Sequence, residues 1–279
     1  MAEITAADVG KLRAMTNAGL MDCKKALTEA NGDLEAAVDI LRTKGKATAA
    51  KKAGRAANEG AIAQNISADS RTGVLAEINC ETDFVAKNDA FKDFCDAITR
   101  KLTENSDASL EEDRVAAVAK LGENIQISRS DRWQMEGNGA LASYIHTGAK
   151  VGVLVEVGTG SADTVNKDEF KQLVRDITLQ IAAGNPQSVD RNGVDQAVLD
   201  REKAILAEQM KDKPPQALEK IMTGKMEKYY QTHCLIDQGF VKQNGEISVN
   251  EHIASVGKVV GDEINVRRFL RYQVGDSGE

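Results

Sequence analysis

The chain has 279 residues, 42% of them hydrophobic and 28% charged, and a formal net charge of −7. This composition is typical of a soluble globular protein and excludes a disordered or fibrous chain. The negative charge argues against a general nucleic-acid binder, because phosphate backbones are bound by clustered lysines and arginines. No apolar run is long enough to span a bilayer, and the first residues lack the basic and apolar regions of a signal peptide. We therefore expect a cytoplasmic protein with no membrane partner.

Residues from about 4 to 44 have the pattern of three short helices joined at glycines. One apolar face of the first helix contains Val9, Leu12 and Met15. Leu20 and Met21 directly follow a turn at Gly19, where their apolar side chains are expected to protrude. We predict a three-helix N-terminal module over residues 1–45, with loops that are free to form a contact surface.

Residues 46–59 are expected to form a basic helical linker, because alanine and lysine both favour helix. The basic side chains in and beside it are Lys44, Lys46, Lys51, Lys52 and Arg55. A phosphate-binding patch is the alternative interpretation of this run, and a solvated linker helix is the one we prefer.

Two parts of the chain repeat each other at a constant spacing. Gly-Ala-Ile-Ala at 60–63 recurs as Gly-Ala-Leu-Ala at 139–142, an offset of 79 residues (139 − 60 = 79). The segment 73–78 recurs as 152–157 at the same offset. Each copy begins with two apolar segments typical of paired strands, followed by an amphipathic helix. The repeat predicts two similar core subdomains.

The second copy is longer than the first. Its closing strand, at 261–266, resembles 122–127 at an offset of 139, which locates an insertion of 60 residues (139 − 79 = 60). Within the insertion, an apolar helical seam precedes Lys213-Pro214-Pro215, which breaks the helix. The seam residues are Val194, Val198, Leu199, Ile205, Leu206 and Met210. We predict a projecting antiparallel helical hairpin at about 187–232, which either mediates self-association or packs on its own domain.

The predicted fold is therefore α+β, with a duplicated core. Its parts are the three-helix module (1–45), the linker (46–59), the first core subdomain (60–138) and the second core subdomain with its inserted hairpin (139–279).

The sequence lacks the usual catalytic and metal-binding patterns. Neither a phosphate-binding loop nor a nucleophile elbow is present. No histidine has metal-ligand spacing to another histidine, a cysteine or a carboxylate. We predict a protein that is not an enzyme, with no catalytic residue, metal site or cofactor. A hydrolase that uses Cys80 and His146 is the alternative, although a buried thiol at a strand end is the commoner case.

The two copies differ most at Thr82-Asp83-Phe84-Val85, which corresponds to Ser161-Ala162-Asp163-Thr164 and shares no residue with it. Because the second copy has no aromatic residue there, the shared fold does not require Phe84. An aromatic side chain beside a carboxylate on a loop is typical of an interface anchor. The alternative is a phenylalanine in the core, with Asp83 capping a turn. His146 is either a polar residue of a hairpin or a second contact point.

These motifs together resemble the bacterial elongation factor Ts family over nearly the whole chain. The residues that carry the resemblance are Arg13 and the segments 19–27, 82–87, 144–148 and 152–155. It implies a guanine-nucleotide exchange factor for the translation GTPase elongation factor Tu. It also implies that the N-terminal module is like a ubiquitin-associated domain. The hairpin would then be used in dimer contacts, giving a heterotetramer with the GTPase.

The resemblance also implies roles for individual residues. Asp83 and Phe84 would wedge beside the switch region of the GTPase and dislodge Mg²⁺, and Thr82 and Val85 would shape the loop. Contacts with the nucleotide-binding domain would come from Arg13, Leu20 and Met21, and a further contact from His146.

Two other functions stay open. A passive adaptor would bind its partner through the N-terminal helices without affecting nucleotide dissociation. An RNA-binding protein would use the run from Lys44 to Arg55, and its binding would depend steeply on salt.

Overall fold

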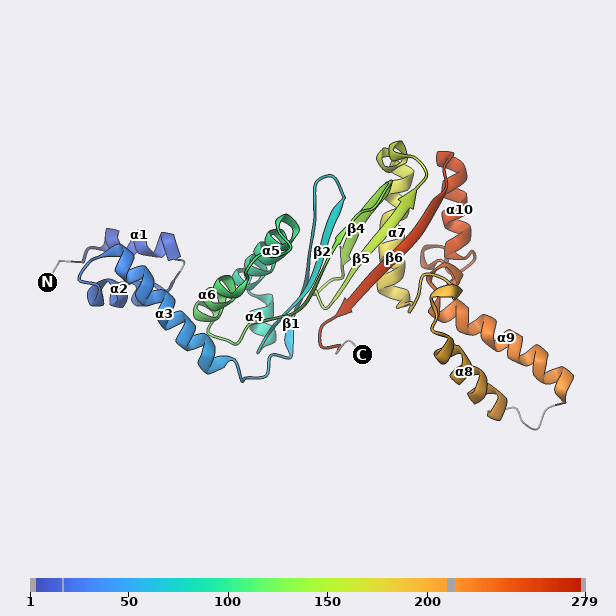
Figure 1. Cartoon of the computed structure of the whole chain (residues 1–279), viewed down its shortest axis with the longest axis horizontal. Coiled ribbons are helices and arrows are strands. Elements are labelled where there is room, and N and C mark those ends of the chain that lie inside the picture. Colours follow the sequence, from blue (N-terminus) through green and yellow to red (C-terminus); the bar gives the residue numbers. More distant parts are fainter. Residues whose placement is uncertain (1–3, 17, 210–213, 277–279) are drawn as a thin grey trace.

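Figure 1 shows the protein as a computed structural model that describes residues 4–16, 18–209 and 214–276. The molecule is elongated: helices α1, α2 and α3 lie at one end, two β-sheets with their covering helices lie in the middle, and a helical hairpin projects at the other end. This arrangement confirms the predicted α+β class. Within the described ranges, no helix is both long enough and apolar enough to cross a membrane.

The N-terminal helices are α1 (Ala6–Thr16), α2 (Leu20–Glu29) and α3 (Leu34–Lys52). Asp33 caps α3, because its carboxylate accepts a hydrogen bond of 3.0 Å from the backbone N–H of Ala36. The helices share one small buried core: Val9, Leu12, Cys23, Ala26, Leu27 and Ala37. Met15, which the sequence pattern placed on the same apolar face as Val9 and Leu12, lies outside this core, since its side chain is 59% exposed near the end of α1.

The third helix does not end near residue 45 but runs unbroken to Lys52. Its second half packs against α6 (Glu111–Leu121). Gly45 permits this approach, because a Cβ atom there would lie only 3.2 Å from Cγ1 of Val115. An ion pair between Arg42 and Glu112 joins the same two helices. One continuous helix therefore connects the N-terminal helices to the core.

Each repeat contains a three-stranded antiparallel sheet covered by two helices. The first sheet has the order β1-β2-β3 and the second has the order β4-β5-β6. The strands are β1 (Glu59–Ile66), β2 (Thr72–Cys80), β3 (Gln126–Gln134), β4 (Gly139–Ile145), β5 (Val151–Thr159) and β6 (Ile264–Gln273). The covering helices are α5 (Asp89–Glu104) and α6 in the first repeat, and α7 (Asp168–Gly184) and α10 (Val249–Val260) in the second.

The two sheets agree in detail at equivalent positions. A β-bulge follows Glu77 in the first sheet and Glu156 in the second. Gly60 and Gly139 have φ angles of +147° and +143°, a conformation that residues with side chains rarely adopt. The repeat seen in the sequence is therefore also a repeat of backbone structure.

The two sheets face each other, and the buried residues between them are Ile62, Leu75, Leu154 and Tyr272. The guanidinium of Arg129 lies 4.0 Å from the ring centroid of Tyr272, and that of Arg268 lies 4.2 Å from the ring centroid of Trp133. These two pairs are equivalent, because each second-repeat residue follows its first-repeat counterpart by 139 positions (268 − 129 = 139 and 272 − 133 = 139).

Backbone hydrogen bonds between the repeats show the same reciprocity. Leu141 N–H donates to the carbonyl of Ser70 at 2.8 Å, and Ile62 N–H donates to the carbonyl of Ala149 at 2.7 Å. The donors are equivalent residues, and so are the acceptors. Each repeat thus donates to the other the same hydrogen bond that it accepts from it, as in a pair related by a two-fold axis.

The insertion in the second repeat forms α8 (Gln196–Gln209) and α9 (Pro215–His233), which lie antiparallel (Figure 1). Residues Met210 and Lys213 of the predicted seam and break lie outside the described residues. Arg191 holds the base of the hairpin: its guanidinium forms two hydrogen bonds of 2.8 Å to Glu227 and two, of 3.0 and 2.7 Å, to Asp237.

The remaining elements are short. They are α4 (Asp83–Lys87) and the 3-10 helices η1 (Ala162–Asn166), η2 (Arg191–Gly193), η3 (Leu235–Asp237) and η4 (Val241–Gln243).

Leu154→Ala tests the packing between the sheets. We expect the free energy of unfolding to fall by about 2–5 kcal/mol, because the change leaves a cavity at a fully buried site. Urea unfolding followed by circular dichroism measures this. The control is Val259→Ala on α10, where the side chain is 70% exposed. It should shift stability by less than about 0.5 kcal/mol. Equal losses in both variants would contradict the packing.

Candidate functional site

The turn between β2 and α5 holds Phe84 on its outer side. Thr82 caps the short helix α4, since its hydroxyl accepts a hydrogen bond of 3.3 Å from Val85 N–H. Val85 and Ala86 face inward and pack against the core of the first repeat. Phe84 faces outward and is 82% exposed. The alternative of a phenylalanine in the core is therefore excluded. We call residues 82–87 the Phe84 turn.

The carboxylate beside Phe84 is held in an ion pair. Asp83 lies 2.7 Å from the ammonium group of Lys87, one helical turn away. The hydrogen bond from Lys87 lowers the pKa of Asp83 below its ordinary value, and the same bond raises the pKa of Lys87. The Phe84 turn therefore presents an ionised carboxylate next to an exposed aromatic ring.

The equivalent turn of the second repeat, η1, has the same backbone design. Ser161 caps it as Thr82 caps α4, with its hydroxyl accepting a hydrogen bond of 3.3 Å from Asp163 N–H. Thr164 points inward, in the place of Val85, and Asp163 is exposed, in the place of Phe84. The two turns therefore share a backbone design, as the repeat predicts, and differ in the side chains that face solvent.

A second exposed patch lies where α1 meets α2. Leu20 and Met21, the first residues of α2, are 53% and 60% exposed, as predicted. Arg13 is exposed on α1. Met15 adds a further exposed apolar side chain that the periodic pattern had assigned to the core. Sequence spacing alone did not identify it, because exposure depends on which face of α1 the other helices cover.

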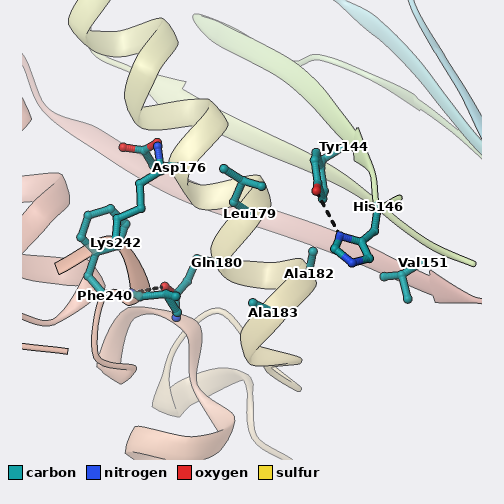
Figure 2. Close-up of a pocket in the computed structure, with 11 residues that line it drawn as sticks. Tyr144, His146, Val151, Asp176, Leu179, Gln180, Ala182, Ala183, Phe240 and Lys242 are labelled. Atoms are coloured by element: carbon teal, nitrogen blue, oxygen red, sulfur yellow. Dashed lines mark hydrogen bonds and ion pairs between the residues drawn. The ribbon is translucent and has the colours of Figure 1, made fainter. Parts of the chain in front are cut away.

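His146 lies in the turn after β4, beside a cavity of about 440 Å³. Figure 2 shows Tyr144 and His146 on one side of this cavity, with Phe240 and Lys242 on the other. The hydroxyl of Tyr144 lies 3.1 Å from Nδ1 of His146. Val241, an exposed apolar residue of η4, also lines the cavity. No sequence signal marked Val241, because it lies outside any periodic segment and is brought near His146 only by the tertiary fold.

The predicted site residues do not form one cavity. The N-terminal patch, the Phe84 turn and the His146 cavity lie on the helical module, the first repeat and the second repeat, respectively (Figure 1). They are separate candidate contact points along an elongated molecule. A large partner can touch all three at once, whereas a small ligand cannot.

The geometry gives little support to a catalytic site formed by Cys80 and His146. Cys80 is fully buried, and burial raises the pKa of its thiol to about 11. Its sulfur donates to the carbonyl of Thr82 at 3.2 Å, whereas the ring of His146 pairs with Tyr144. In the part of the chain that the structure describes, no group of three or more His, Cys, Asp or Glu side chains is placed to hold a metal ion.

The basic run from Lys44 to Arg55 makes several contacts within the chain. Lys44 Nζ lies 2.5 Å from the carboxylate of Glu29, and Lys52 donates to the carbonyl of Gly122. Arg55 lies 3.6 Å from Glu81. These contacts reduce the positive charge available to phosphates, so they favour a structural role for the run over RNA binding.

Exposed apolar side chains on well-anchored turns are typical of a protein that binds other proteins. Residues 81–276 match the family model described as "Elongation factor TS". Over 288 aligned positions the chain is 43% identical to elongation factor Ts of Symbiobacterium thermophilum, with 100% of this chain and 94% of that protein covered. The chain therefore belongs to the elongation factor Ts family.

Other relatives agree over the same length. The chain is 41% identical to elongation factor Ts of Trichlorobacter lovleyi, with 99% of this chain and 94% of the relative covered. It is 39% identical to elongation factor Ts of Desulfovibrio desulfuricans, with 98% of this chain and 99% of the relative covered.

Lys87→Met tests the ion pair of the Phe84 turn. We expect the pKa of Asp83 to rise toward the ordinary value of 3.8, because the hydrogen bond that favours the carboxylate is lost. Since pairing lowers this pKa, the pair stabilises the turn above pH 3.8, and its contribution is lost as pH falls through the lowered value.

NMR titration of the Asp83 carboxyl carbon measures this change. Lys92→Met is the matched control, because Lys92 pairs with Asp89 at 3.0 Å on the neighbouring helix and should leave the titration of Asp83 unchanged. An Asp83 titration that is the same in Lys87→Met and in the unchanged chain would contradict the ion pair.

Proposed function

We propose that the protein is a guanine-nucleotide exchange factor for the translation GTPase elongation factor Tu. It binds this partner in the cytoplasm, dislodges Mg²⁺ from the nucleotide site and promotes release of GDP so that GTP can bind. The observation that carries the proposal is the exposed ring of Phe84 beside the ionised Asp83, on a capped turn of a chain that belongs to the elongation factor Ts family.

The proposed mechanism is thermodynamic linkage and involves no covalent step. A factor that binds the nucleotide-free GTPase more tightly than the GDP-bound form must weaken GDP binding by the same factor. Loss of Mg²⁺ removes the largest local positive charge that holds the diphosphate. The chain makes and breaks no bond in its partner's nucleotide, so in this proposal it is not an enzyme in the usual sense.

Each contact point has its own part in the proposal. Phe84 inserts beside the switch region, and Asp83 competes for hydrogen-bond donors there or perturbs the cation site electrostatically. Thr82 and Val85 hold the turn in place through the cap and the core contact. Arg13, Leu20 and Met21 contact the nucleotide-binding domain, and His146 makes a further contact with Val241 beside it.

The hairpin is proposed to join two copies of the chain, which would give a heterotetramer with two GTPase molecules. Val198 and Ile205 on α8 support this role, because they are exposed apolar side chains on an element that projects from the core (Figure 1).

Phe84→Ala tests the exchange function. We expect GDP release from elongation factor Tu to slow by about tenfold or more, because an anchoring aromatic contact is lost. Stopped-flow fluorescence with a fluorescent GDP measures the rate, and circular dichroism checks that the fold is kept. Val259→Ala, at an exposed valine away from the three contact points, should keep the rate of the unchanged chain. A normal rate for Phe84→Ala would remove Phe84 from the mechanism.

The combined change of Val198 and Ile205 to Glu tests self-association. We expect light scattering to report a fall from the mass of two chains to that of one, because two charges in an apolar contact oppose association. Val259→Glu, which adds the same charge outside the hairpin, should leave the mass unchanged. A mass that is the same in the hairpin variant and the original chain would count against the dimer.

A further inference from the structure

Three residues between α6 and β3, Gly122–Asn124, each bind a different segment of the chain. Gly122 accepts a hydrogen bond at its carbonyl from Lys52 at the end of α3. The side chain of Glu123 binds the Phe84 turn. The side chain of Asn124 binds the backbone that follows α3. We call Gly122–Asn124 the junction turn, because two of the proposed contact points are attached to it.

Glu123 holds the start of the Phe84 turn with both carboxylate oxygens. Oε2 accepts hydrogen bonds of 3.0 Å from the backbone N–H groups of Glu81 and Thr82, and Oε1 accepts one of 2.6 Å from the hydroxyl of Thr82. The same hydroxyl oxygen accepts from Val85 N–H to cap α4. A hydroxyl donates once and still accepts, so one side chain links Glu123 to the helix that carries Phe84.

Gly122 and Asn124 bind the end of α3 and the backbone that follows it. Asn124 is fully buried, and its Nδ2 donates to the carbonyls of Arg55 at 2.8 Å and Ala53 at 3.4 Å. Its own N–H donates to Oε1 of Glu81 at 2.6 Å. The Glu123 carboxylate therefore binds backbone N–H groups at the start of the Phe84 turn, and the Glu81 carboxylate binds a backbone N–H of the junction turn. The end of α3 lies against the same group of residues.

The second repeat shows which of these contacts the fold itself needs. Asp262, equivalent to Glu123, accepts hydrogen bonds from Ser161 N–H at 3.0 Å and from the hydroxyl of Thr164. An acidic anchor for the turn is thus common to both repeats. Glu263, equivalent to Asn124, is exposed instead of buried. A buried asparagine occurs only in the repeat that receives α3.

We propose that Glu123 and Asn124 are positioning residues for nucleotide exchange: Glu123 sets the direction of Phe84, and Asn124 sets the place of the Leu20–Met21 patch relative to it. This inference rests on the proposed exchange function. A partner that binds both contact points gains more affinity if their spacing is held before binding, since ordering them on binding costs free energy.

Glu123→Gln is the first test. A side-chain amide has one acceptor oxygen and two N–H donors, so it cannot accept all three hydrogen bonds. We expect the exchange rate to fall by about tenfold, because the Phe84 turn loses hydrogen bonds to a charged group that hold its start in place. Asp262→Asn is the matched control: it weakens the equivalent anchor in the second repeat by removing its charge, and it should leave the exchange rate within about twofold. Thermal melts compare the loss of stability in the two variants.

A double-mutant cycle separates positioning from stability. If Glu123 acts through Phe84, adding Glu123→Gln to Phe84→Ala should slow exchange no further, because the side chain that it positions is already gone. Thr82→Val is a second variant with a milder change, which removes the link between Glu123 and Val85 and keeps the size of the side chain. Thr82→Val should slow exchange by the same factor as Glu123→Gln, and it should slow exchange no further when added to Phe84→Ala.

Asn124→Ala tests the second half of the inference. We expect a higher concentration for half-maximal exchange and an unchanged maximal rate, because loosening the N-terminal helices weakens binding and leaves Phe84 in place. The increase should vanish when Leu20 and Met21 are both changed to Ser. A normal half-maximal concentration, or an increase that persists in that background, would overturn this part.

The outcomes distinguish this inference from the function on which it rests. If the unchanged chain does not accelerate GDP release, the exchange function fails. If Phe84→Ala slows exchange but Glu123→Gln and Thr82→Val do not, the function stands and the positioning role is overturned. It is also overturned if Glu123→Gln slows exchange by the same factor in the Phe84→Ala background, or if Asp262→Asn slows exchange equally.

Discussion

Leu75 and Leu154 occupy equivalent places in the two repeats, and both are fully buried where the sheets face each other. Around them the same cation–π contact occurs twice, once from Arg129 to Tyr272 and once from Arg268 to Trp133. This reciprocal packing uses the inner faces of both sheets and leaves the turns at their ends free. The N-terminal helices and the hairpin extend from this frame in opposite directions (Figure 1), so their relative positions depend on it.

The free turns explain how two copies of one fold can differ in role. In both, a hydroxyl cap and an acidic anchor determine the backbone, and the inward side chain fills the core. The outward position contributes little to this structure, because its side chain faces solvent. It can therefore be Phe84 in one repeat and Asp163 in the other without a change of fold. An aromatic side chain exposed at such a position is available to a partner.

Much of this arrangement was predictable from residue patterns. Apolar segments predicted the paired strands, the constant offset of the repeat predicted two similar subdomains, and the changed offset located the insertion that holds the hairpin. The contrast between Thr82–Val85 and its counterpart singled out Phe84 as a residue that the fold does not need. Met15 was misplaced, because its burial depends on how α2 and α3 cover α1. Val241 was missed, because it lies in the short 3-10 helix η4, beside a turn far away in the sequence.

The sequence by itself determined the local structure, because helix and strand periods, glycine turns and the internal repeat are encoded by residues close together in the chain. It also determined the family, through motifs that keep their order and spacing. Only the tertiary structure decided that α3 continues into the core, that Phe84 faces solvent, and that Glu123 and Asn124 hold segments about 40 and 70 residues away. Such hydrogen bonds depend on the packing of the whole chain, and no local pattern records which donor a carboxylate will meet or which carbonyl an amide will meet.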